Sequence, residues 1–175
     1  MRKDWVRAMQ HEDPAPRPVA VHMLYDAFRS AYDRARESVP KEIGGFIAGY
    51  LLLVRSTNEH HLVIEEEIPV RSRSTALTVE FLTEGAREVA DRINKLRRSG
   101  LYVVGWYHSH PGYSCYPSKL DIKSHKTYFR EPYQVGLIID PINKEACVFQ
   151  VAEEPYNMLP FYVWRGPRWV IKESL

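Results

Sequence analysis

The chain has few cysteines and no long apolar run, and these absences exclude several classes of protein. It has only two cysteines, Cys115 and Cys147, which form neither a CxxC pair nor a disulfide framework, so a reducing compartment is expected. No apolar segment approaches the roughly 18 residues of a membrane-spanning helix. The N-terminus, Met-Arg-Lys, lacks the apolar stretch of a secretory signal. We therefore expect a cytoplasmic protein with no membrane partner.

The sequence also lacks a strong charge of either sign, internal repeats and low-complexity tracts. The net charge of +2 argues neither for nor against nucleic acid, and we expect no nucleic-acid partner. The hydrophobic content of 45% and charged content of 26% are ordinary for a globular protein. At 175 residues, the chain fits one domain with a sizeable core. Residues 1–18 are predicted to form a mobile lead, and residues 19–175 the folded domain.

Hydrophobic spacing along the chain predicts helices interspersed with strands. Helices are expected at 22–38 and 81–98, with a third beginning near Ser118. Strands are expected at 43–54, 61–69, 101–107, 134–140, 146–152 and 161–164. Several neighbouring strands have hairpin-like spacing. This order predicts an α/β fold in which a mixed sheet is flanked by helices.

One block of the sequence carries most of the chemistry. His108, His110, Ser118 and Asp121 follow the spacing His-x-His, seven residues, Ser-x-x-Asp. Two imidazoles and a carboxylate form a three-ligand set for a catalytic zinc ion, which leaves a coordination position for water. The Ser118 hydroxyl is a hydrogen-bond donor placed close to that position. The block therefore indicates metal-assisted hydrolysis.

The expected local structure brings these four side chains together. Side chains alternate along a strand, so His108 and His110 should point the same way at the end of the strand that begins near Leu101. Ser118 lies where a helix should begin, and serine is a preferred N-cap residue. Asp121 follows three residues later, on the same face of the first turn. A strand end and a helix start thus supply the predicted ligands.

Hydrolysis of this kind also needs a group that accepts the proton of the attacking water. The best candidate is Glu42, which opens the apolar strand predicted at 43–54. The alternative is an ordinary strand-end charge in solvent. Glycines at 44, 45 and 49 fit a close approach of this strand to a neighbouring backbone or ligand.

Three other polar features favour less specific roles. Cys115 lies in the motif loop, and its aromatic and proline neighbours indicate a loop rim rather than a fourth ligand or a nucleophile. His60 and His61 lie beside the predicted hairpin turn and are expected to be exposed, without a bound metal. The acidic run Glu65–Glu67 is expected to be a solvated strand end.

Glu42 with Gly45 downstream, followed by the His-x-His-Pro-Gly and Ser-x-x-Asp block, resembles the JAMM motif of MPN-domain metalloproteases. The segments 103–112, 130–135 and 138–141 are similar to the same family. The resemblance covers about residues 20–153. It extends to the catalytic subunits of the proteasome lid and the COP9 signalosome, and to stand-alone prokaryotic members.

The resemblance implies a fold, a cofactor and a reaction. The fold would be a single-domain α-β-α sandwich with a mixed central sheet, of the cytidine-deaminase-like type. One Zn²⁺ would be held by His108, His110 and Asp121. Glu42 would be the general acid and base, and Ser118 would stabilise the oxyanion. The reaction would be the removal of ubiquitin or a ubiquitin-like protein from a lysine side chain.

The resemblance leaves substrate and partners open. The first possibility is an isopeptidase acting on ubiquitin-like conjugates, with proteasome-type or ubiquitin-like conjugation machinery as a further candidate partner. The alternatives are a peptidase that processes sulfur-carrier or ubiquitin-like precursors or small substrates, and a non-catalytic MPN scaffold. Residues 71–75 correspond in position to the first insertion of the family, near its substrate site. The chain ends soon after the strand predicted at 161–164, which favours a stand-alone enzyme or a small complex.

Overall fold

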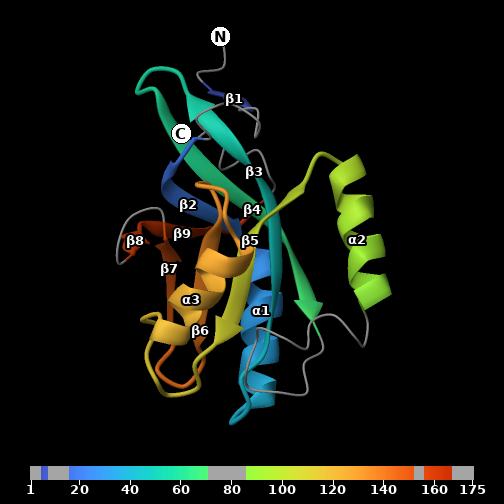
Figure 1. Ribbon diagram of the computed structural model, residues 1–175, viewed down its shortest axis with the longest axis vertical. Coiled ribbons are helices and arrows are strands. Elements are labelled where there is room, and N and C mark those ends of the chain that lie inside the picture. The colour runs from blue at the N-terminus through green and yellow to red at the C-terminus, as the bar shows by residue number, and fades with distance from the viewer. Residues whose placement is uncertain (1–4, 8–15, 71–85, 152–155, 167–175) are drawn as a thin grey trace.

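The computed structural model describes residues 5–7, 16–70, 86–151 and 156–166. A mixed sheet forms its centre, with helices on both faces (Figure 1). The helices are α1 (Tyr25–Ser38), α2 (Ala86–Arg98) and α3 (Lys119–Tyr128). The strands are β1 (Trp5–Arg7), β2 (Pro18–Leu24), β3 (Gly44–Val54), β4 (Glu59–Val70), β5 (Tyr102–Ser109), β6 (Val135–Asp140), β7 (Glu145–Gln150), β8 (Asn157–Leu159) and β9 (Phe161–Trp164).

The strand order is β8-β7-β6-β5-β3-β4-β2-β9, with β1 added to the far end of β3. Pairings β2/β4, β2/β9 and β5/β6 are parallel, and the others are antiparallel. The two edge strands, β8 and β9, are separated in the chain only by Pro160. The sheet must therefore curl until its edges approach each other. The connecting Pro160 is held to the neighbouring strand β2, because its carbonyl accepts from the Val21 amide.

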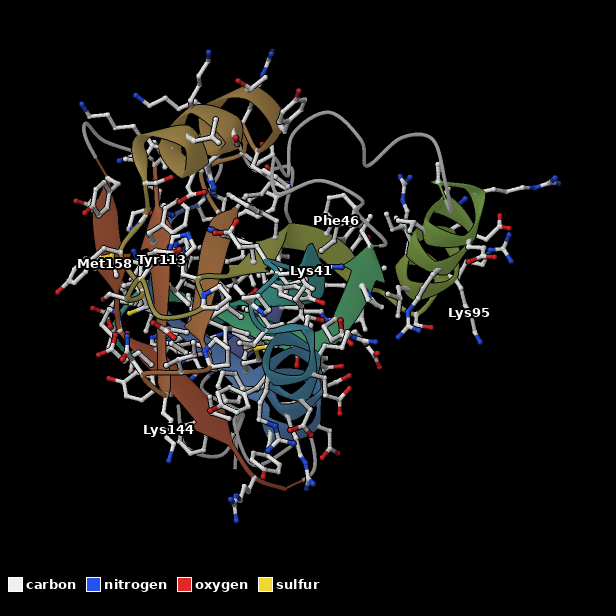
Figure 2. All side chains as sticks on the ribbon, turned by 90° about the horizontal axis from the view of Figure 1, so that it is seen from below. Lys41, Phe46, Lys95, Tyr113, Lys144 and Met158 are labelled. Carbon is white, nitrogen blue, oxygen red and sulfur yellow. The ribbon has the colours of Figure 1, made fainter. Side chains whose placement is uncertain are left out.

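Each face of the sheet buries its own apolar cluster. Ala27, Ala31 and Ala35 recur every four residues on α1 and are buried against one face. The other face carries α2 and the motif helix α3. No residue of α2 is fully buried, and Figure 2 shows Lys95 on it pointing away from the sheet. Within the described ranges, no helix is both long enough and apolar enough to cross a membrane.

Strand β3 is central because it is apolar on both faces and pairs with β4 along its length and with β5 over Gly44–Gly49. Gly45 lies where β3 closely approaches both β4 and β5. A Cβ atom there would overlap the Ile68 carbonyl oxygen and lie 2.7 Å from the Tyr107 ring. The predicted need for glycine at this position is confirmed.

The α/β fold with a mixed central sheet is confirmed, but the expected start of the first helix was wrong. The helix predicted at 22–38 begins only at Tyr25, because Pro18–Leu24 forms β2 between β4 and β9. In the predicted lead, Trp5–Arg7 pairs with β3, while most of the remainder lies outside the described residues. The helix predicted at 81–98 is described from Ala86 onward.

The acidic run at the end of the predicted second strand is not a solvated strand end. Glu65 and Glu67 lie within strand β4 and are buried. The Tyr50 hydroxyl donates to Glu65, and the Tyr107 hydroxyl donates to Glu67 at 2.9 Å. Arg34 of α1 pairs with Glu67. Buried donors and a cation thus replace the water that these carboxylates were expected to contact.

Candidate metal centre

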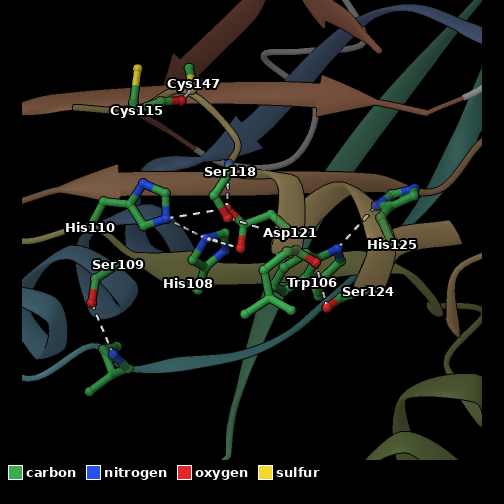
Figure 3. Close-up of polar contacts among 12 residues, drawn as sticks. Trp106, His108, Ser109, His110, Cys115, Ser118, Asp121, Ser124, His125 and Cys147 are labelled. Carbon is green, nitrogen blue, oxygen red and sulfur yellow. Dashed lines mark hydrogen bonds and ion pairs between the residues drawn. The ribbon is translucent and has the colours of Figure 1, made fainter. Parts of the chain in front are cut away.

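Three side chains with metal-ligating atoms converge at the end of β5 and the start of α3 (Figure 3). The Nε2 atoms of His108 and His110 are 2.8 Å apart. Asp121 places Oδ1 3.2 Å from the His108 Nε2 and Oδ2 3.4 Å from the His110 Nε2. Ligand atoms around one tetrahedral zinc ion are separated by about 3.3 Å, given metal–nitrogen bonds of about 2.05 Å. The three residues therefore fit a single small cation.

The local structure predicted for this block is confirmed. His108 lies near the end of β5 and His110 directly after it, and both rings reach the same carboxylate. Ser118 is the N-cap of α3: its Oγ accepts from the Asp121 amide at 3.2 Å. Asp121 completes a capping box by accepting from the Ser118 amide at 2.6 Å. The cap fixes the helix start and the ligand carboxylate together.

The pKa shifts of the three residues show that the centre favours a positive charge next to the Asp121 carboxylate. Burial alone would raise the pKa of Asp121, but hydrogen bonds and charge from the two histidines lower it well below its usual range. Burial lowers the pKa of His108. At His110, burial acts in the same direction, but Asp121 outweighs it and the pKa is raised. A metal ion would supply the positive charge that otherwise comes from a protonated imidazole.

His108 is oriented mainly by ring packing. The Trp106 ring stacks on it, with centroids 4.6 Å apart and planes 9° apart. The Trp106 Nε1–H in turn donates to the Nδ1 atom of His125, a buried residue of α3. Within the described part of the chain, the buried Nδ1 atom of His108 has no hydrogen-bond partner. Trp106 lies two residues before His108 and so on the same face of the predicted strand, but its supporting role was not anticipated.

Glu42 lies just before β3, beside the histidines. The Ile43 amide donates to the Ser109 hydroxyl, and the Ser109 amide donates to the Ile43 carbonyl, both at 2.9 Å. These bonds hold Ile43, and with it the neighbouring Glu42, beside Ser109, the residue between the two histidines. The negative charge of Glu42 acts to raise the pKa of both His108 and His110, which places the carboxylate within electrostatic reach of the centre. Its side chain is half-buried, not fully solvated.

Cys115 does not join the convergent group found among the described residues. The Cys147 thiol on β7 contacts the Cys115 carbonyl oxygen, so the two cysteines connect the motif loop to the sheet. Burial, followed by the nearby Cys115 thiol, raises the pKa of Cys147, and a thiol kept neutral is a poor nucleophile or ligand. The segment 71–75, which was expected to lie near the substrate, falls outside the described residues.

The sequence of the chain matches the model of a known family, and its fold matches a solved structure. The family model described as prokaryotic homologs of the JAB domain matches residues 25–153, which contain every residue of the candidate centre. Protein DSY2949 of Desulfitobacterium hafniense has a similar solved structure, with a TM-score of 0.60 over 85% of this chain and 95% of that one. At 19% identity, this likeness concerns the fold alone.

Curated relatives are similar to more than half of the chain. The 26S proteasome non-ATPase regulatory subunit 14 of Dictyostelium discoideum is 25% identical over 70% of this chain and 39% of its own length. The Lys-63-specific deubiquitinase BRCC36 of Xenopus tropicalis is 28% identical over 62% of this chain and 41% of its own. COP9 signalosome complex subunit 5 of Candida albicans is 34% identical over 56% of this chain and 15% of its own. The chain thus spans less than half the length of each.

Proposed function

Because this chain belongs to the family of prokaryotic homologs of the JAB domain, we propose that it is a zinc-dependent isopeptidase. Its substrates are conjugates in which the C-terminus of ubiquitin or a ubiquitin-like protein is joined to a lysine amine. The observation that carries this proposal is the convergence of His108, His110 and Asp121, with ligand atoms 2.8–3.4 Å apart. The half-buried carboxylate of Glu42 lies beside them.

Zinc held by His108, His110 and Asp121 would supply a Lewis acid that activates water and polarises the scissile carbonyl. The chain's own contribution begins with the orientation of these ligands. The capping box holds Asp121 from the helix side, and the Trp106 ring holds His108 from the sheet side. Preorganised ligands of this kind do not need to rearrange during the reaction.

Glu42 is the group that moves the proton. Its carboxylate accepts a proton from the attacking water and returns it to the lysine amine as the amine leaves. Its location supports both transfers. The paired Ile43–Ser109 bonds fix the start of β3 beside the ligands, and the side chain remains accessible to water.

Ser118 stabilises the negative charge that develops on the carbonyl oxygen. Its hydroxyl oxygen already accepts from the Asp121 amide. A hydroxyl has one hydrogen to donate in addition to its acceptor lone pairs, so accepting from the amide does not use that hydrogen. In the resting protein the hydroxyl faces the Asp121 carboxylate, and during the reaction it would donate to the oxyanion instead. A donor of this type typically contributes about 3 kcal/mol to transition-state stabilisation.

The substrate class is supported by what the relatives are named for. One is named as a Lys-63-specific deubiquitinase, and two others as subunits of the 26S proteasome and the COP9 signalosome. The match to each of them covers less than half of the relative. For this chain we propose a ubiquitin-like modifier and a cytoplasmic location, with conjugation or proteasome-type machinery as the associated partner.

Glu42→Gln tests the proposal most directly. Zinc should stay bound, because Glu42 is not one of the three convergent ligands, while hydrolysis should fall by about 100-fold or more. The assay measures zinc content, and cleavage of di-ubiquitin, ubiquitin-like conjugates and precursor fusions, with and without a chelator. Glu37→Gln, at an exposed carboxylate near the end of α1, is the matched control.

The outcomes separate the possible functions. Cleavage by Glu42→Gln at the parent rate would exclude Glu42 as the base. Cleavage of precursor fusions but not lysine conjugates would favour the processing peptidase. A wild-type protein that binds no zinc and cleaves nothing would favour a scaffold.

A further inference from the structure

The second histidine of the centre is oriented by a backbone carbonyl of its own loop. His110 Nδ1 lies 3.2 Å from the Ser114 carbonyl oxygen. A carbonyl only accepts, so Nδ1 carries the hydrogen, and in the neutral ring Nε2 is left with the lone pair that can bind a metal. The tautomer of His110 therefore depends on where Ser114 is held.

Ser114 has a backbone conformation that needs support. Its φ is +69°, in the left-handed region that is unfavourable for residues other than glycine and asparagine. Its amide donates to Asp140 Oδ2 at 2.9 Å, and the Gly112 amide donates to Oδ1 of the same carboxylate at 3.0 Å. Asp140 thus holds the loop at two points on either side of residue 113.

Asp140 is itself anchored in the sheet. It is the last residue of β6 and is fully buried. Its carboxylate also accepts from the Ile142 amide at 2.9 Å and from the Asn143 amide and side-chain amide at 3.1 and 2.7 Å. Burial alone would raise the pKa of Asp140, but the backbone donors lower it to about 2. The ionised carboxylate accepts hydrogen bonds from five donors. It therefore joins the motif loop, at residues 112 and 114, to the turn between β6 and β7.

We propose that Asp140 is a positioning residue for the metal centre: by holding Ser114 in its left-handed conformation, it fixes the His110 tautomer and so sets zinc affinity and geometry. The proposal rests on the zinc-dependent function proposed above. Asp140 does not join the convergent ligand group, so its effect passes through Ser114 to His110. Partners that orient a metal ligand in this way contribute about 10- to 100-fold to metal affinity, and we expect an effect of that size for Asp140.

Asp140→Asn tests the connection with little change in size. Asparagine replaces one acceptor oxygen with an NH₂ group, which cannot accept from the amides that converge on this carboxylate. We expect zinc to bind about 10- to 100-fold more weakly to the folded variant, measured by competition with a chromophoric chelator. We also expect the visible absorption spectrum of the cobalt-substituted protein to change, because the ligand geometry is altered. If this variant does not fold, Asp140→Ser, which keeps one acceptor, is measured in its place.

Two companion variants separate positioning from stability. Asn143→Ala removes a 2.7 Å hydrogen bond from the same carboxylate but leaves the bonds to Gly112 and Ser114. It should lower the free energy of unfolding without changing zinc affinity. Adding Ser114→Gly to Asp140→Asn should restore part of the affinity, because glycine adopts positive φ without strain.

The outcomes distinguish this proposal from the function on which it rests. If wild type binds zinc and folded Asp140→Asn binds it equally tightly, the positioning role is wrong and the zinc function stands. Equal losses of affinity in Asp140→Asn and Asn143→Ala would also overturn it, since stability alone would then account for the effect. If wild type binds no zinc, both proposals fail.

Discussion

Two pairs of histidines in the described part of the molecule have ring nitrogens at nearly the same distance from each other. The groups that surround the two pairs differ. In the candidate metal centre, the Nε2 atoms of His108 and His110 are 2.8 Å apart. Beside β2 and β4, His22 Nε2 lies 3.0 Å from His61 Nδ1. Distance between imidazoles alone would make both pairs candidates for a metal.

What differs is the third partner. Asp121 offers one carboxylate oxygen to each histidine of the first pair. In the second pair, the Trp164 Nε1–H donates to His22 Nδ1 at 2.9 Å. Indole N–H only donates, so His22 must carry its hydrogen on Nε2 and donate it to His61. Both nitrogens of His22 are occupied, and no anion is part of the contact.

The pKa values follow the same division. Burial, then the charge of His61, lowers the pKa of His22 to about 4, and burial lowers that of His61. At His110, Asp121 raises the pKa despite burial. One environment favours neutral rings bonded to each other, and the other favours a positive charge between them. A metal site therefore needs an anionic ligand and available lone pairs, in addition to paired imidazoles.

The largest expected effect is a loss of zinc affinity at the first pair, His108 and His110. Asp121→Asn removes the anionic ligand, and zinc affinity should fall by more than about 100-fold, the upper range for changes outside the ligand set. Metal content and chelator competition measure this loss. His61→Gln is the counterpart in the second pair and should keep one zinc per chain. Equal zinc loss in both variants would contradict the distinction between the two pairs.

A smaller effect concerns protons at the second pair. The folded pKa of His22, about 4, lies below its unfolded value of about 6.5, so the unfolded chain binds the extra proton. Stability from this group is therefore present above pH 6.5 and is lost as the pH falls toward 4. At pH 5 the loss should be at most about 2 kcal/mol.

Urea unfolding of wild type and His22→Gln at pH 7 and pH 5 measures this contribution. All other titrating groups are shared by the two proteins, so the difference between their pH dependences isolates His22 and its coupling to His61. If the two proteins lose the same free energy between these pH values, His22 is not held neutral by the fold.

The metal centre could be predicted from the sequence because its geometry is local. His108 to Asp121 lie on one strand, one loop and one helix start, and the alternation of a strand and the preference of serine for an N-cap predict their meeting. Glu42 was predicted from its position before an apolar strand, and the structure places it beside the histidines. Its catalytic role stays a prediction.

The features that were missed depend on contacts between distant parts of the chain. His61 was expected to be exposed, but it is half-buried against His22, 39 residues away. Strand β2 was partly assigned to a helix, because its parallel partners β4 and β9 cannot be identified from local spacing. Asp140 has no local sign of its role, since the amides of Gly112 and Ser114 lie 28 and 26 residues earlier.

The smallest expected effect comes from removing the Trp164 donor, which occupies His22 Nδ1 in the second pair. Trp164→Phe keeps an aromatic ring but leaves His22 Nδ1 without its partner, which should lower the free energy of unfolding by about 1 kcal/mol. Tyr162→Phe is the matched control, because Tyr162 contacts His22 by ring stacking, at 5.3 Å between centroids. Zinc content should remain one per chain in both variants, since a freed lone pair does not supply the anion that Asp121 provides. A second equivalent of zinc in Trp164→Phe would mean that the tryptophan donor, rather than the absence of a carboxylate, keeps this pair from binding metal.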